Sequence, residues 1–214
     1  MLEPDVTITD FALAIECAVF AVLLVRRGAP GNTTNRLFAL TFAALCASSL
    51  FGGIWHGVFS GTETQVGRWV WFATMTALAC AALMLWRVGA SWIGHDPWAG
   101  RIREVAFVQF VAQVVTSAFI TDAFAIGAVG MMPPIALVTV LYTNRYRTTR
   151  SQRALSGVAG FSLAVFSGLV IAFDVSLHPV WATTHAVYHA LQFMAFLLVF
   201  LSVPAAGPYH ARAE

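Results

Sequence analysis

The chain has 214 residues, of which 59% are apolar and only 10% are charged. A soluble domain contains roughly 25% charged residues, so this composition excludes an ordinary soluble fold. The formal net charge is only +2, which means that the positions of the charges are more informative than their sum. The sequence contains no lysine, and this excludes a retinal Schiff base, because that bond requires an amine.

Seven continuously apolar stretches divide the chain, each close to the roughly 20 residues that a helix needs to cross a bilayer. Their apolar residues do not alternate with period two, which favours helices over a transmembrane β-barrel. We therefore expect an all-α fold, a single seven-transmembrane helical bundle over residues 1–214. In chain order the predicted spans are residues 8–25, 37–59, 69–86, 104–121, 126–142, 154–173 and 180–203.

The arginines predict how the bundle is inserted. Eleven of the twelve fall on one side of the predicted spans, and only Arg68 falls on the other. Excess basic residues mark the cytoplasmic face, so we expect an external N-terminus, a cytoplasmic C-terminus and a multi-pass protein of the cytoplasmic (inner) membrane. Topology explains these clusters, and no nucleic-acid partner is expected. The eleven are Arg26, Arg27, Arg36, Arg87, Arg101, Arg103, Arg145, Arg147, Arg150, Arg153 and Arg212.

Two further patterns concern the interior of the spans. Cys17, Cys46 and Cys80 fall inside the first three spans, and an odd number of buried cysteines argues against a disulfide framework.

The fifth span contains Pro133 and Pro134, which should bend it. The carbonyl groups that these prolines leave unpaired are expected to find partners on neighbouring helices.

Three histidines are expected to meet at one depth in the membrane. His185 and His189 are four residues apart, which places them on one face of the last span, and His56 lies near the end of the second span. Because the second span runs outward and the seventh runs inward, all three lie at the outer level. Three neutral imidazoles with an open fourth position are the ligand set of a catalytic zinc site. The alternative is that each imidazole only bonds across helices.

Two polar residues are candidates for binding a substrate near these histidines. Gln192 shares the face of His185 and His189, where it would orient a ligand histidine or a substrate carbonyl. Ser49 lies on the same stripe as His56, and its alternative role is a hydroxyl bond to its own helix.

The acidic residues supply the remaining candidates. Glu16 lies at mid-membrane, where a carboxylate must be protonated, paired or bound to a cation. Asp10, Asp174, Glu63 and Asp122 are expected at the outer rim. We take Glu63 and Asp122 as the candidate catalytic residues, whose carboxylates would accept a proton from water as general bases.

At this point the pattern resembles a known superfamily. Seven spans with an external N-terminus, His56 near the end of the second span and the string His185-Ala186-Val187-Tyr188-His189 at the start of the last are similar to the CREST hydrolases. That superfamily includes the alkaline ceramidases and the progestin and adipoQ receptors. The resemblance implies that His56, His185 and His189 bind Zn²⁺ and that the substrate is a membrane lipid with an amide bond.

The resemblance also has implications outside the histidines. Ceramidases bind Ca²⁺ near an acidic N-terminus, to which Glu3, Asp5 and Glu16 are loosely similar. The family places a serine four residues before the histidine of the second span and an aspartate on the third, and these positions fall at Gly52 and Gly67 here.

These observations lead to two functional hypotheses. The first is a zinc-dependent intramembrane hydrolase that acts on a lipid amide or ester, with substrate entering sideways from the outer leaflet. The alternative, which the glycines at the serine and aspartate positions favour, is a non-enzymatic, metal-containing receptor or lipid-binding protein. Haem ligation would leave one imidazole unused, and transport is disfavoured because the sequence has no repeated half.

Overall fold

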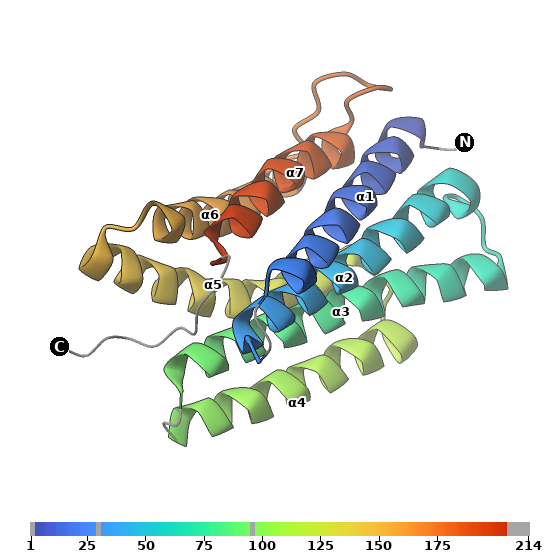
Figure 1. Cartoon of the computed structure of the whole chain (residues 1–214). Helices are drawn as coiled ribbons and strands as arrows, with labels where there is room; N and C mark the ends of the chain where they lie inside the picture. The colour runs from blue at the N-terminus through green and yellow to red at the C-terminus, as the bar shows by residue number, and fades with distance from the viewer. Residues whose placement is uncertain (1–2, 29–30, 95–96, 205–214) are drawn as a thin grey trace.

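The computed structural model of the chain describes residues 3–28, 31–94 and 97–204, so Arg212 lies outside the described residues. Within them the fold is all-helical, with seven helices that are long and apolar enough to cross a membrane (Figure 1). The helices are α1 (Pro4–Arg27), α2 (Thr33–Ile54), α3 (Gln65–Ile93), α4 (Pro97–Phe119), α5 (Phe124–Thr149), α6 (Gln152–Ala172) and α7 (Thr184–Ser202). A five-residue π-helix, η1 (Trp55–Phe59), continues α2.

Local sequence explains where several helices start. Pro4 lies in the first turn of α1, where its missing N–H costs nothing. The Asn32 side chain caps α2 by accepting from the backbone N–H of Asn35, and the Thr64 hydroxyl caps α3 by accepting from that of Gly67. These are the usual N-cap residue types.

Most helices extend beyond the apolar runs from which we predicted them. α3 continues to Ile93, and α5 continues to Thr149. Arginine is a good helix former whose apolar stem lies along the helix while its charge reaches water, so the helical backbone does not stop where the apolar residues stop. α7 begins only at Thr184, because Pro179 precedes it in a loop where His178 and Ala182 form a β-bridge.

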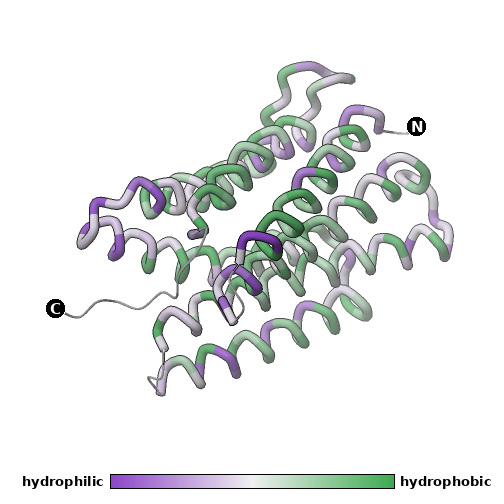
Figure 2. Tube along the Cα trace, in the orientation of Figure 1, coloured by the Kyte–Doolittle hydropathy of each residue, from purple (hydrophilic) through white to green (hydrophobic). Residues whose placement is uncertain are grey.

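Six helices close into a ring, and α4 lies outside it. α1 packs against α2 and α7, and the ring continues through α3, α5 and α6 back to α7 (Figure 1). α4 packs mainly on α3 and is the least buried of the seven. Figure 2 shows hydrophilic positions gathered at the helix ends and in the loops, with apolar positions between them. This distribution is the one that a bilayer requires of a helical bundle.

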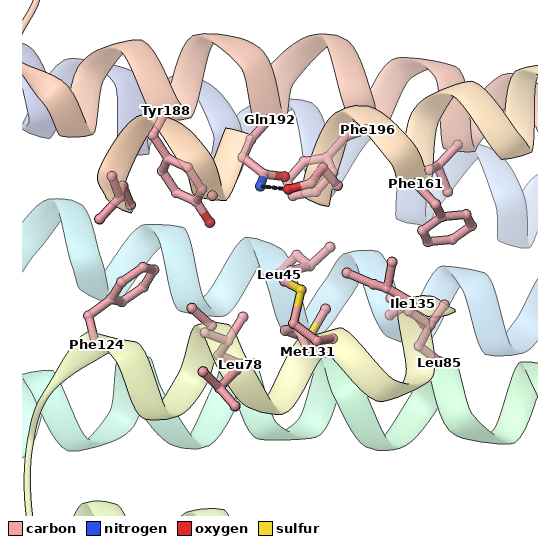
Figure 3. Close-up of a pocket in the computed structure, with 18 of the residues that line it drawn as sticks. Leu45, Leu78, Leu85, Phe124, Met131, Ile135, Phe161, Tyr188, Gln192 and Phe196 are labelled. Atoms are coloured by element: carbon pink, nitrogen blue, oxygen red, sulfur yellow. Dashed lines mark hydrogen bonds between the residues drawn. The ribbon is translucent and has the colours of Figure 1, made fainter. Parts of the chain in front are cut away.

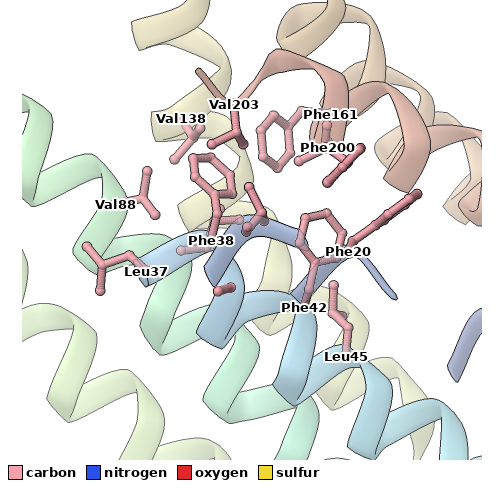
Figure 4. Close-up of a cluster of buried hydrophobic side chains, with 14 of the residues drawn as sticks. Phe20, Leu37, Phe38, Phe42, Leu45, Val88, Val138, Phe161, Phe200 and Val203 are labelled. Carbon is pink, nitrogen blue, oxygen red and sulfur yellow. The ribbon is translucent and has the colours of Figure 1, made fainter. Parts of the chain in front are cut away.

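The half of the ring at the arginine-rich end is filled with aromatic and aliphatic side chains (Figure 4). Phe20 of α1 stacks on Phe200 of α7, with ring centroids 4.2 Å apart, and meets Phe42 of α2 edge-on at 5.4 Å. The Arg27 guanidinium lies 4.2 Å from the centre of the Phe200 ring and donates to the backbone carbonyls of Phe200 and Val203. Phe38, Phe42 and Phe161 of this cluster also line an internal cavity that continues toward the other end of the ring.

A neighbouring helix satisfies a carbonyl that the proline pair of α5 leaves unpaired, as predicted. Pro134 has no N–H to offer the carbonyl of Gly130, four residues earlier. Gln109 of α4 donates to that carbonyl at 2.6 Å and accepts from the indole N–H of Trp86 on α3 at 2.9 Å. One glutamine therefore joins the peripheral helix α4 to both α3 and α5.

The three cysteines, Cys17, Cys46 and Cys80, are free thiols. This agrees with the expectation from their odd number.

Candidate functional site

The structure brings His56, His185 and His189 together at the end of the bundle opposite the arginines. His56 lies in η1, and the other two lie in the first turns of α7. The rings of His56 and His185 have centroids 6.2 Å apart. His56 also meets the Trp71 ring of α3 edge-on, at 6.1 Å. Short π-helical segments are frequent at functional sites, and η1 holds one of the three imidazoles.

A glycine stripe on α2 and η1 lets α1 approach closely. A Cβ atom on Gly53 would lie 3.2 Å from the Phe11 ring, and one on Gly57 would lie 3.1 Å from the Thr7 methyl group. A Cβ atom on Gly52 would lie 3.1 Å from Oδ2 of Asp10. The Asp10 carboxylate therefore occupies the space that a side chain at position 52 would need.

Residues of the N-terminal segment and α1 orient two of the imidazoles. Nδ1 of His56 lies 2.5 Å from the Glu3 carboxylate, which also accepts a hydrogen bond from the Ser60 hydroxyl. Nδ1 of His189 lies 3.0 Å from the Thr9 hydroxyl, whose oxygen lies within 3.0 Å of the backbone carbonyls of Asp5 and Val6. When the Thr9 hydroxyl donates its one proton to one of these carbonyls, it accepts from Nδ1–H of His189.

This tautomer has a consequence for the other nitrogen of His189. When Nδ1 carries the proton, Nε2 of a neutral imidazole presents a lone pair. Nε2 lies 3.6 Å from Oδ1 of Asp10, which is 5% exposed. That distance is too long for a hydrogen bond, and two acceptors that face each other out of water need a positive charge between them. In this tautomer, either a proton on the Asp10 carboxyl group or a cation between the two atoms would satisfy both of them.

Hydrogen bonds fix the start of α7 in front of this site. Oδ2 of Asp5 accepts from both the backbone N–H and the hydroxyl of Thr183, at 3.0 and 2.6 Å. Oδ1 of Asp174 accepts from the Thr184 hydroxyl at 2.6 Å. These bonds join the loop that precedes α7 to α1 and to the end of α6, so they limit the movement of His185.

Two cavities meet at the histidines. A polar chamber of about 100 Å³ is lined by Asp10, the three histidines and Ser49, among others. An apolar cavity of about 390 Å³ extends from it into the ring. Figure 3 shows Tyr188, Gln192 and Phe196 of α7 pointing into this cavity toward Leu45, Leu78 and Met131. Leu45, Leu78, Phe124, His185, Tyr188, Gln192 and Phe196 line both spaces.

The apolar cavity reaches the surface of the bundle between α5 and α6. Val129 of α5, which is 68% exposed, belongs to its lining. Gly168 of α6 also lines it, and a Cβ atom there would have no neighbour within 4 Å. The cavity is therefore open to the outside of the bundle at this point.

The remaining predicted residues divide into two groups. Ser49 and Gln192 line the chamber, and the Gln192 amide donates to the Ser167 hydroxyl of α6 at 2.7 Å. Glu63 and Asp122, our candidate acids, are exposed in loops outside the chamber lining, and the backbone carbonyl of Asp122 accepts from the Trp71 indole.

Asp10 takes the position that we had expected of Glu63 or Asp122. We had placed Asp10 at the rim, but it is buried and lines the chamber. The adjacent glycines Gly52 and Gly53 were the available signal, because a glycine pair on a helix permits close approach of a neighbour. Glu16 is buried away from the chamber lining, and its Oε2 has no hydrogen-bond partner.

In the part of the chain that the structure describes, no group of three or more His, Cys, Asp or Glu side chains is drawn together closely enough to hold a metal ion. The chemistry of the donors nevertheless suits zinc. Three imidazoles and a carboxylate border one chamber, and on His56 and His189 the Nδ1 atom is held by an oxygen partner. Oxygen partners of this kind orient the histidines that bind metals through the other nitrogen.

Comparison with other proteins places the chain in a family. No curated protein and no solved structure matches it. A match to a family of unknown function, DUF6962, covers residues 6–208, from the first turn of α1 to beyond the end of α7. The chain belongs to the family DUF6962.

Proposed function

We propose that the protein is a zinc-dependent intramembrane hydrolase that cleaves a lipid amide or ester. One observation supports this most strongly: Nε2 of His189 and the Asp10 carboxylate face each other at 3.6 Å inside a chamber that opens into an apolar cavity. A zinc ion held by this nitrogen would carry its bound water near Asp10, and the carboxylate could accept the proton that the water releases.

His56, His185 and His189 are the residues that would hold the ion. Bound zinc would polarise the substrate carbonyl and activate a water molecule. Glu3 and Thr9 keep the Nδ1 atoms of His56 and His189 occupied, which leaves Nε2 of each ring for the metal. Asp10 is the acid that lines the chamber, and its role is to accept the proton that the attacking water releases.

The apolar cavity provides the binding site for the acyl chain. Its volume of about 390 Å³ lies in the range of pockets for small ligands. A chain that enters between α5 and α6 reaches His185 and Tyr188 at the junction with the chamber. The scissile carbonyl then lies among the imidazoles, while the headgroup remains at the end of the bundle.

The proposal includes the orientation that the arginines predict. With the arginine-rich end in the cytoplasm, the N-terminus is external and the C-terminus is cytoplasmic. The histidines then face the outer leaflet of the cytoplasmic membrane, and the substrate is a lipid of that leaflet.

The similarity to the CREST superfamily supports the same function. The family's serine position falls at Gly52, and in this protein the Asp10 carboxylate occupies the space beside that glycine. We propose that an acid on α1 here replaces the polar groups that the family places on its second and third helices.

The test is the zinc content of the detergent-purified protein, measured beside the variant His56→Ala/His185→Ala/His189→Ala. His178→Ala is the matched control, because His178 is exposed in the loop before α7 at the same end of the bundle. We expect about one zinc per chain in the wild type and the control, and none in the triple variant. Equal zinc in all three proteins refutes the metal site.

A second measurement separates the enzyme from the receptor alternative. The zinc-loaded protein is incubated with a fluorescent long-chain ceramide and with a long-chain fatty ester. Release of fatty acid that is absent from the triple variant supports hydrolysis. Stoichiometric zinc without turnover of either lipid refutes the enzyme and favours a metal-containing lipid receptor.

A further inference from the structure

A second groove lies at the opposite end of the bundle, between the end of α1 and the start of α2. It has a volume of about 750 Å³, and its lining residues lie between Ala21 and Gly28 at the end of α1 and between Gly31 and Ala43 at the start of α2. Val22 and Val25 of α1 form one wall, and Ala39 and Leu40 of α2 form the other. Because this groove is far along the helices from the histidines, it belongs to neither of the cavities described above.

The polar end of the groove is positively charged. Arg26 and Arg36 line it, and both are exposed. The groove also includes Asn32 and Thr33, the N-cap and first residue of the 22-residue helix α2. The N-terminus of a helix presents unpaired N–H groups and the positive end of the helix dipole. Two guanidinium groups and a helix N-terminus therefore meet where the apolar walls end.

Asn35 is a second, independent observation that points to a ligand in this groove. It lines the groove and is only 2% exposed, yet neither the nitrogen nor the oxygen of its side-chain amide has a hydrogen-bond partner. A buried amide without partners is unfavourable. Its nitrogen needs an acceptor, and its oxygen needs a donor.

We propose that the groove binds an anionic phospholipid whose headgroup contains a hydroxyl group, such as a phosphatidylglycerol. The phosphate diester pairs with Arg26, Arg36 and the N-terminus of α2. The phosphate supplies an acceptor and the headgroup hydroxyl supplies a donor, which together satisfy Asn35. One acyl chain lies along Ala39 and Leu40.

The apolar walls favour a lipid over a soluble phosphate compound. Val25 and Leu40 are 66% and 44% exposed, so the groove continues along the part of the helices that faces hydrocarbon. A soluble phosphate would fill only the polar end. Arginines at a membrane surface attract anionic lipids, and here the walls extend that attraction into a shaped site.

The experiment measures lipid binding to the detergent-purified full chain by native mass spectrometry and by thermal unfolding. The probes are dioleoylphosphatidylglycerol, dioleoylphosphatidylcholine, which has the same chains but no net charge, and glycerol phosphate, which has no chains. We expect one tightly held phosphatidylglycerol, little retained phosphatidylcholine, and no stabilisation by glycerol phosphate.

Variants locate the site. Arg26→Gln/Arg36→Gln should bind phosphatidylglycerol about 30-fold more weakly, since each arginine near a membrane surface contributes about fivefold in affinity. Asn35→Leu, which removes the unpaired amide, should weaken binding while the protein remains folded. Arg101→Gln/Arg103→Gln removes the same charge from exposed positions at the start of α4 and should retain the affinity of the wild type.

Three results would overturn this proposal. They are equal loss of affinity in both arginine pairs, equal binding of phosphatidylcholine, and equal stabilisation by glycerol phosphate. The last would mean that any phosphate anion suffices. The outcome is independent of zinc binding at the other end of the bundle, so this site stands or falls separately from the proposed hydrolase.

Discussion

Replacement of Gly52 by alanine tests whether the Asp10 carboxylate occupies the space beside this glycine. The new methyl group would lie 3.1 Å from Oδ2 and 3.5 Å from Cγ of Asp10. Gly52→Ala must therefore displace the carboxylate or separate the two helices.

Opposing contributions set the size of the effect. Crowding of a packed interior costs about 1–3 kcal/mol, whereas a change from glycine to alanine within a helix contributes about 1 kcal/mol of stability. In the wild-type background we expect Gly52→Ala to lower the free energy of unfolding by about 0–2 kcal/mol. In an Asp10→Ala background the crowding disappears, and Gly52→Ala should raise the free energy of unfolding by about 1 kcal/mol. The coupling between the two positions is then about 1–3 kcal/mol.

The assay is reversible unfolding of the four proteins of this double-mutant cycle in detergent. Gly168→Ala is the matched control, because a Cβ atom on that helical glycine meets nothing within 4 Å, and it should stabilise both backgrounds equally. A coupling below about 0.5 kcal/mol, the usual limit for independent sites, would refute the placement of Asp10 beside Gly52.

Three other predictions follow from the structure. Gln109→Leu leaves the Gly130 carbonyl and an indole N–H without partners and should lower the free energy of unfolding by about 1–3 kcal/mol, measured by denaturant titration; no change would mean that other groups satisfy that carbonyl. Gly168→Phe should block the mouth of the apolar cavity and abolish binding of a fluorescent fatty acid, whereas Val165→Phe on the same helix, outside the cavity lining, should not; equal binding by both variants would exclude entry between α5 and α6. Glu3→Gln should weaken zinc binding about 10–100-fold in a chelator competition, and an unchanged affinity would show that this carboxylate does not support the metal.

The fold could be predicted because the bilayer imposes its own length on each apolar run. All seven predicted spans correspond to helices. Their ends could not be placed, since α3 and α5 continue into segments with arginines where hydropathy no longer distinguishes helix from loop. The exclusion of α4 from the ring also depends on side-chain packing that the hydropathy of the sequence does not show.

The sequence predicted the depth of the site residues in the membrane, but it could not predict how each helix is rotated about its axis. Chain direction and distance from the helix ends placed His56 level with His185 and His189, and the structure brings these three residues together. Which acid faces them depends on how α1 is rotated and how closely it approaches α2. For this reason Asp10 lines the chamber while Glu63, at a similar predicted level, is exposed in a loop.

The ring closes where α1 meets α7, and the proposed site is divided between them. Asp10 and the groups that orient the imidazoles are on or beside α1, whereas His185 and His189 are on α7. A ribosome that has released six helices into the bilayer has made the acid but neither of these imidazoles. Binding of the proposed metal would thus become possible only after α7 has joined the other helices, so that bound metal would report an assembled ring.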